Sequence, residues 1–82
     1  MSRIDFLILA ILENNNARSR TSSMSLREIA DTEAFGCKEN TIFKSLKKSE
    51  KKGYVATGLK DGHANTYFIT KLGAAYLQKE KE

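Results

Sequence analysis

SLREIADTEAFGCKENTIFKSLKKSEKKGYV, residues 25–55, contains the patterns of two helices with a turn between them. The first pattern begins with Ser25 and Glu28, which have the spacing of a capping box. In that motif the serine hydroxyl accepts from the third helical amide, and the glutamate returns to the cap. A narrow apolar stripe follows at helical spacing, formed by Leu26, Ile29 and Ala30. The stretch therefore predicts a short helix over residues 26–32.

The second pattern predicts a longer helix over residues 38–52. Its inner face is formed by Ile42, Ser45, Leu46 and Ser49. Phe35 and Gly36 are expected in the turn before this helix, because glycine adopts positive φ at little cost. Gly53 is expected to end the helix as a left-handed C-terminal glycine.

Residues 3–13, RIDFLILAILE, predict a helix that is apolar on two sides. One side is formed by Ile4, Leu7, Ile8 and Ile11. The other is formed by Phe6, Leu9 and Leu12. A helix that is apolar nearly all round needs two covers. The domain core is one cover, and the other is either a partner subunit or the rest of the same small domain.

Residues 14–24 are polar and predict a loop, with a short strand near residues 22–24. Asparagine and serine favour this because their side chains form local hydrogen bonds to the backbone. Arg18 and Arg20 make the loop mildly cationic. A loop of this length is often functional.

Residues 54–59 and 66–69 are rich in β-branched and aromatic side chains and predict two strands. The six residues between them, KDGHAN, contain the turn signal Asp-Gly, so the two strands are expected to form a β-hairpin. Thr70 is expected to cap a last helix over residues 71–82. Helices followed by a small antiparallel hairpin indicate an α+β fold.

The chain has 82 residues, which predicts one domain over residues 1–82. Its single cysteine, Cys37, allows neither an internal disulfide nor a cysteine-based zinc cluster, and this favours a reducing compartment. No stretch reaches the length of a membrane span, and the apolar run over residues 6–12 lacks a cleavage site, so we expect a cytoplasmic protein. The single histidine, His63, and Cys37 are on different elements, so no metal and no cofactor are expected.

Positive charge is concentrated in one segment. The net charge is +4, and residues 38–60 hold seven lysines against Glu39 and Glu50, a local net charge of +5. Such a segment fits an anionic partner, most simply nucleic acid. The alternative is a solvated helix face without a partner. An enzyme is not expected, because there is no G-x-x-x-x-G-K-[ST] loop and one histidine leaves no Ser-His-Asp set.

Residues 25–55 resemble the helix-turn-helix of winged helix-turn-helix proteins. They contain the signals I-A, T-I, K-K-S-E-K-K-G and Y-V in that order. NTYFITKLGAAYL, residues 65–77, resembles the second wing strand and the helix after it. The similarity covers about residues 3–78 and is greatest to bacterial transcriptional regulators of the MarR and PadR type. Ser49 departs from the leucine usual at that position, so either Phe43 or Tyr76 fills the space or Ser49 faces solvent.

The resemblance implies a transcriptional regulator whose helix over residues 38–52 enters the major groove of double-stranded DNA. It implies that a wing over residues 60–65 contacts the backbone or the minor groove. The residues implied in base readout are Lys38, Asn40, Thr41, Phe43 and Lys44. Those implied at the backbone are Ser25, Arg27, Lys47 and Lys48. Those implied in the wing are Lys60, His63 and Asn65.

Particular base contacts follow from side-chain chemistry. Asn40 would pair with adenine, and either Thr41 or Phe43 would touch a thymine methyl group. Glu39 is better explained by the helix dipole, because an acid in the first turn is favourable without DNA.

A homodimer is expected, formed through residues 3–13 and the C-terminal helix, because dimers read operators whose half-sites lie about 34 Å apart. A small-molecule effector is not evident. Two other functions stay open. One is a winged-helix module that binds proteins, and the other is a non-specific architectural or replication-associated DNA binder.

Overall fold

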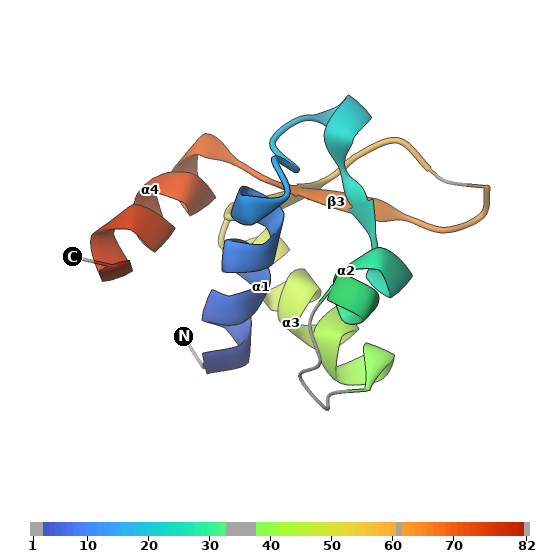
Figure 1. Ribbon diagram of the computed structural model, residues 1–82, viewed down its shortest axis with the longest axis horizontal. Coiled ribbons are helices and arrows are strands. Elements are labelled where there is room, and N and C mark those ends of the chain that lie inside the picture. The colour runs from blue at the N-terminus through green and yellow to red at the C-terminus, as the bar shows by residue number, and fades with distance from the viewer. Residues whose placement is uncertain (1–2, 33–37, 61, 82) are drawn as a thin grey trace.

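The computed structural model describes residues 3–32, 38–60 and 62–81 (Figure 1). In chain order the elements are helix α1 (Arg3–Asn14), the 3-10 turn η1 (Arg20–Ser22), strand β1 (Met24–Ser25), helix α2 (Leu26–Thr32), helix α3 (Glu39–Lys51), strands β2 (Val55–Thr57) and β3 (Thr66–Ile69), and helix α4 (Lys71–Lys81). The strands form one antiparallel sheet in the order β1-β3-β2. The predicted α+β fold is confirmed. Phe35, Gly36 and Cys37 lie outside the described residues.

The core lies where α1, α2 and α3 pack on one another and on the sheet. Its largest fully buried apolar side chains come from all four helices and from β2 and β3, and they are Ile8, Leu9, Leu12, Ile29, Ile42, Leu46, Val55, Tyr67, Ile69 and Leu77. Among the described residues, no helix is both long and apolar enough to cross a membrane.

The predicted capping box at the start of α2 is confirmed, and α2 has the predicted bounds. The Ser25 amide donates to Glu28 Oε1 at 3.0 Å, and the Glu28 amide donates to Ser25 Oγ at 3.2 Å. The two residues therefore satisfy each other's free amides, as the spacing predicts.

Helix α3 is one residue shorter at each end than the predicted 38–52. The four predicted inner residues, Ile42, Ser45, Leu46 and Ser49, are all buried. Gly53 follows the helix with φ of +81°, a left-handed conformation that favours glycine, so the predicted stop is confirmed.

Ser49 is only 1 % exposed, so the prediction that it could face solvent is wrong. Phe43 does not fill the space either, because it is 37 % exposed on another side of α3. Tyr76, the remaining alternative, is partly buried against the core. Ser49 Oγ is buried and has no hydrogen-bond partner among the described residues.

Helix α1 ends one residue later than predicted and is covered mostly within the same chain. Leu9 and Leu12, assigned to its second apolar side, are fully buried in the core. Four apolar residues of α1 remain partly exposed, namely Ile4, Phe6, Leu7 and Ala10. The rest of the same chain therefore covers most of the apolar surface of α1.

The predicted loop over residues 14–24 contains more structure than its composition indicates. Ala17 is fully buried, and its carbonyl accepts from the Ile69 amide at 2.8 Å. The short strand expected near residues 22–24 is β1, in which Met24 pairs with Tyr67 of β3. The predicted hairpin of β2 and β3 is therefore extended by β1 to a three-stranded sheet.

The segment that leads into the wing, from Gly58, is held at its base by η1, whose Arg20 carbonyl accepts from the Leu59 amide at 3.2 Å. The Ser23 and Thr66 hydroxyls share a hydrogen bond of 2.7 Å, and Ser23 Oγ donates to the Arg20 carbonyl at 2.9 Å. Gly58 sits so close to this turn that a Cβ there would collide with the Ser23 side chain. The wing therefore leaves the sheet from a fixed base.

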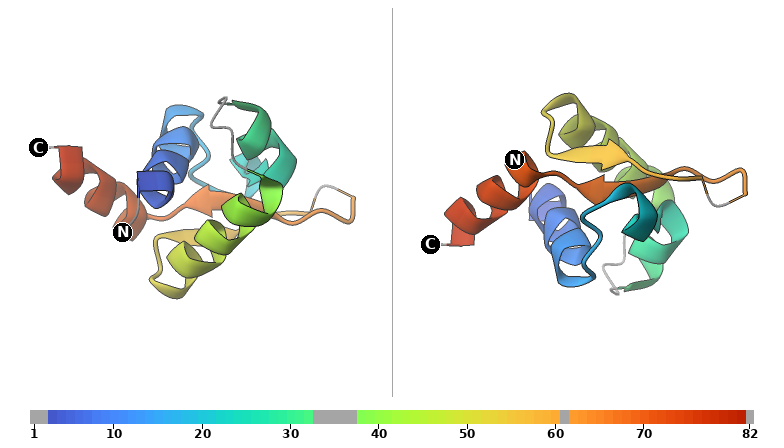
Figure 2. Two further views of the ribbon diagram at one scale, coloured as in Figure 1. Left: turned by 90° about the horizontal axis from the view of Figure 1, so that it is seen from below. Right: turned by 90° about the horizontal axis from the view of Figure 1, so that it is seen from above.

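Helix α4 is anchored to the start of β2. Thr70 caps it as predicted, because its hydroxyl accepts from the Gly73 amide at 3.0 Å and donates to the Gly53 carbonyl at 2.6 Å. The Tyr76 ring stacks on Tyr54 with 4.7 Å between ring centroids. The wing and α4 project from opposite ends of the molecule (Figure 2).

Candidate nucleic-acid interface

The outer side of α3 carries a polar and cationic ridge. Its members recur at i, i+4, i+7 and i+11, and they are Asn40, Lys44, Lys47 and Lys51. They lie opposite the buried residues of α3, so the helix presents them away from the core. The side chains of Asn40, Lys44 and Lys51 make no hydrogen bond or ion pair within the described part of the chain.

Lys38 occupies the N-cap of α3, where the backbone is extended and no side-chain cap forms. The position favours serine, threonine, aspartate or asparagine, and the helix dipole disfavours a cation there. Lys38 is exposed, so local structure gives no reason for a lysine. Glu39, the first residue of α3, carries a negative charge, which the N-terminal end of the helix dipole stabilises.

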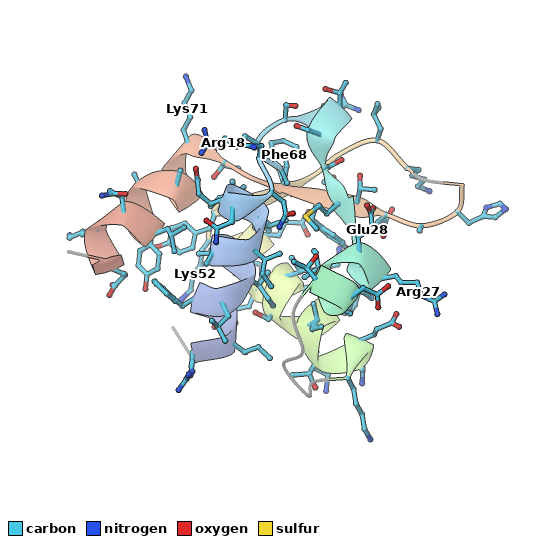
Figure 3. All side chains as sticks on the ribbon, viewed as in Figure 1. Arg18, Arg27, Glu28, Lys52, Phe68 and Lys71 are labelled. Atoms are coloured by element: carbon cyan, nitrogen blue, oxygen red, sulfur yellow. The ribbon has the colours of Figure 1, made fainter. Side chains whose placement is uncertain are left out.

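A groove of about 360 Å³ lies between the start of α2, α3 and the wing. We call it the wing groove, and it is lined by Ser25, Leu26, Arg27, Glu39, Phe43, Ala64, Asn65 and Tyr67. It brings together Arg27, Phe43 and Asn65, which are predicted site residues from three separate elements. The exposed Arg27 side chain extends outward from α2 (Figure 3).

A second hollow lies on the other side of α3, where the helix meets α1. It is lined by Ile4, Asp5, Thr41, Lys44, Ser45 and Lys48. Thr41 and Phe43, the two predicted methyl contacts, therefore face different hollows.

Asp5 is a site feature that sequence reasoning missed. Its carboxylate is 1 % exposed, accepts a hydrogen bond from Ser45 Oγ, and forms an ion pair of 2.9 Å with Lys48 Nζ. The signal was a lone carboxylate within an apolar helix, but nothing local identifies its partners on α3. Lys48 is thus tied to a buried acid in addition to its predicted backbone role.

Lys47 also contacts two neighbouring side chains of α3. Its Nζ lies 3.2 Å from Glu50 Oε1 and 5.5 Å from the centroid of the Phe43 ring. The side chain is 43 % exposed, so the ammonium remains accessible to a ligand. The contacts position it over the phenyl ring.

Ser25, predicted to contact the DNA backbone, is part of the capping box of α2. Its side chain is buried and its hydroxyl accepts from Glu28, which commits it to the cap. The buried, capped hydroxyl of Ser25 is therefore not available to a phosphate.

The three predicted wing residues, Lys60, His63 and Asn65, are all exposed. Asn65 lines the wing groove beside α3. In Figure 1 the wing extends past α2, on the side of the molecule away from α4. No group of three or more metal-binding side chains occurs in residues 3–32, 38–60 and 62–81.

Solved structures with this fold include TubR from Bacillus megaterium pBM400, with a TM-score of 0.84 and 22% identity over 100% of this chain and 88% of that one. A PadR family transcription regulator from Clostridium difficile R20291 has a TM-score of 0.75 and 24% identity over 98% of this chain and 84% of that one.

BpsR from Bordetella bronchiseptica, whose DNA binding is regulated by 6-hydroxynicotinic acid, has a TM-score of 0.79 and 14% identity over 96% of this chain. This chain spans about half of BpsR, covering 52% of it. No protein-family profile and no curated protein sequence matches the chain. The predicted winged-helix fold is confirmed.

Proposed function

We propose that this protein is a regulator of transcription that binds double-stranded DNA sequence-specifically through α3 and the wing. The observation that carries the proposal is the outward ridge of α3 beside the wing. A major groove admits one helix, and the N-terminal residues of that helix come nearest to the base edges. The DNA binding of BpsR and the regulator of the PadR family support the same function.

The base-reading residues are those at the N-terminal half of the ridge. Asn40 is exposed, and its amide can pair bidentately with adenine N6 and N7. Lys44, one turn later, can reach guanine or a phosphate. Lys38 extends the cationic surface at a cap position that local structure does not explain.

The backbone contacts come from both flanks of the ridge. Arg27 lies across the wing groove from the wing, and Lys47 and Lys51 continue the ridge beyond the reading positions. Lys60, His63 and Asn65 bring the wing to the sugar-phosphate backbone or the minor groove. Lys48 contributes less than Lys44, because Asp5 already compensates its charge.

We further propose that the protein acts as a homodimer at the nucleoid, with α1 and α4 forming the seam. Phe6, Leu7 and Ala10 leave a partly exposed apolar strip on α1. Leu72 of the adjacent α4 is 55 % exposed. Leu7→Glu and Leu72→Glu would shift the molar mass measured by light scattering from dimer toward monomer.

The test is selection of bound duplexes from a random pool at low and at physiological salt, followed by sequencing. We expect a palindromic motif at physiological salt. Asn40→Ala should relax preference at one base pair per half-site, at a cost of about 1–3 kcal/mol. The control Lys71→Ala, at an exposed position off the Leu72 face of α4, should leave the motif and the affinity unchanged.

Two outcomes contradict the proposal. Binding without an enriched motif would indicate a non-specific architectural protein, whose affinity comes from phosphate contacts alone. Absence of binding at either salt would indicate a protein-interaction module, and the lysines of α3 would then be a solvated face.

A further inference from the structure

Phe43 is an exposed phenyl ring on the lysine-rich helix α3. Phe43 is 37 % exposed, whereas the other apolar residues of α3, Ile42 and Leu46, are fully buried. A large apolar side chain loses favourable free energy when it stays in water. Its neighbours on the outer side of α3 are polar or charged.

We propose that Phe43 recognises the C5 methyl group of a thymine in the major groove, next to the base pair that Asn40 reads. The inference rests on the proposed DNA binding and names the base that one part of the site selects. In the major groove thymine alone among the four bases presents a methyl group, so an apolar contact there discriminates against cytosine.

The spacing of Phe43 and Asn40 suits adjacent base pairs. Residues three apart on a helix have Cβ atoms about 5–6 Å apart on the same side. Successive base pairs are separated by about 3.4 Å along the duplex. One residue can therefore contact one base pair while the other contacts the same pair or the next.

The structure separates Phe43 from Thr41, the other methyl-bearing residue predicted at the DNA. Thr41 faces the hollow that contains the buried carboxylate of Asp5. Phe43 faces the wing groove, whose lining includes the apolar Leu26, Ala64 and Tyr67. Ser25, Arg27, Glu39 and Asn65 complete the lining, and its apolar members favour exclusion of water from a methyl group that contacts the ring.

Lys47 orients the ring before any ligand arrives. Its ammonium lies 5.5 Å from the Phe43 ring centroid, within the range of a cation–π contact. Lys47 is held in turn by Glu50 at 3.2 Å. A side chain already restrained in its bound orientation loses less conformational entropy on binding.

The experiment replaces thymine with deoxyuridine, which lacks only the C5 methyl group. Each thymine of a duplex selected by the protein is replaced in turn, and dissociation constants are measured by fluorescence anisotropy at fixed salt. Loss of one buried methyl group is expected to weaken binding about fourfold at one thymine per half-site. 5-Bromodeoxyuridine at that position, where bromine replaces the methyl group, should restore affinity.

Three variants test whether Phe43 or Thr41 causes the difference in affinity between the thymine and deoxyuridine duplexes. Phe43→Ala should bind the thymine and deoxyuridine duplexes equally, whereas Phe43→Leu should keep part of the difference. Thr41→Ala should keep the full difference. Thermal unfolding of each variant checks that the exposed position can be changed without loss of the fold.

The outcomes separate this inference from the proposed function. If a motif is selected but no deoxyuridine substitution weakens binding, the methyl contact is refuted and the DNA-binding function stands. If the difference persists in Phe43→Ala and disappears in Thr41→Ala, Phe43 is the wrong residue. If no duplex binds at all, both the inference and the proposed function are wrong.

Discussion

Asp5 of α1 and Lys48 of α3 form an ion pair of 2.9 Å that joins the first helix to the helix we propose reads DNA. The Asp5 carboxylate is 1 % exposed, whereas the Lys48 side chain is 51 % exposed. Ser45, one turn before Lys48, donates to the same carboxylate. The group fixes the register between α1 and α3, because a buried charge is favourable only where its partners meet it.

Asp5→Asn should therefore destabilise the protein. It removes the charge that Lys48 pairs with, and we expect the free energy of unfolding to fall by about 1–3 kcal/mol. Urea denaturation measures the change. Lys51→Ala, which alters an exposed lysine of the same helix, is the control and should fall within about 0.5 kcal/mol of the wild type.

A double-mutant cycle with Asp5→Asn and Lys48→Met isolates the pair. The two single changes should be non-additive by at least about 0.5 kcal/mol, since the residues are in direct contact. Additive effects would mean that the ion pair contributes no coupling between α1 and α3.

Ser49→Ala should stabilise the protein. The Ser49 hydroxyl is buried without a hydrogen-bond partner among the described residues, and such a group costs about 1–3 kcal/mol of desolvation. Alanine keeps the Cβ and removes the oxygen. Thermal unfolding should show a raised Tm, and a lowered Tm would indicate that the hydroxyl is satisfied in solution.

Ser25→Ala should reduce stability without altering DNA affinity at a temperature where the variant is folded. The hydroxyl caps α2, and loss of an N-cap costs about 1 kcal/mol. Chemical denaturation measures the loss. A uniform loss of affinity for specific and non-specific duplexes in the folded variant would restore Ser25 to the backbone contacts.

Gly73→Ala should destabilise the protein although it lies in a helix. Helix propensity alone predicts a gain of about 1 kcal/mol. A Cβ at Gly73, however, would collide with the Tyr54 carbonyl and lie 2.9 Å from Ile69 Cγ1. We expect a net loss of about 1–3 kcal/mol, against which Ala75→Gly, at an exposed position of α4, reports propensity alone.

Lys44→Ala should weaken binding to specific and non-specific duplexes alike if Lys44 contacts a phosphate. The slope of the logarithm of affinity against the logarithm of salt concentration should then fall by about one. Anisotropy titrations at several salt concentrations measure it, with the exposed Lys71→Ala as the control. An unchanged slope with altered base preference would instead assign Lys44 to base readout.

Features that depend on neighbours in the chain were predictable from sequence. The capping box of Ser25 and Glu28, the left-handed Gly53 and the Thr70 cap all act within one helical turn. The inner face of α3 followed from the 3.6-residue period, which includes the buried Ser45 and Ser49 without regard to their polarity.

Features that join distant segments were not predictable. Nothing near Asp5 indicates that its partners are 40 or more residues away, and nothing near Ser23 indicates that Thr66 meets it. The sequence indicated a short strand near residues 22–24, but nothing near it indicates that β1 pairs with β3, 40 or more residues away.

The sequence by itself determined which segments are helices and strands and which side of α3 carries lysine, because periodicity and caps are local physics. Only the tertiary structure decided what each lysine meets: Lys48, beside the ridge, pairs with a buried acid, Lys47 lies over Phe43, and Lys44 and Lys51 are exposed to solvent. Charges of the same kind in one helix thus differ in role, because the energy of a charge depends on the neighbours and the solvent that the fold brings to it.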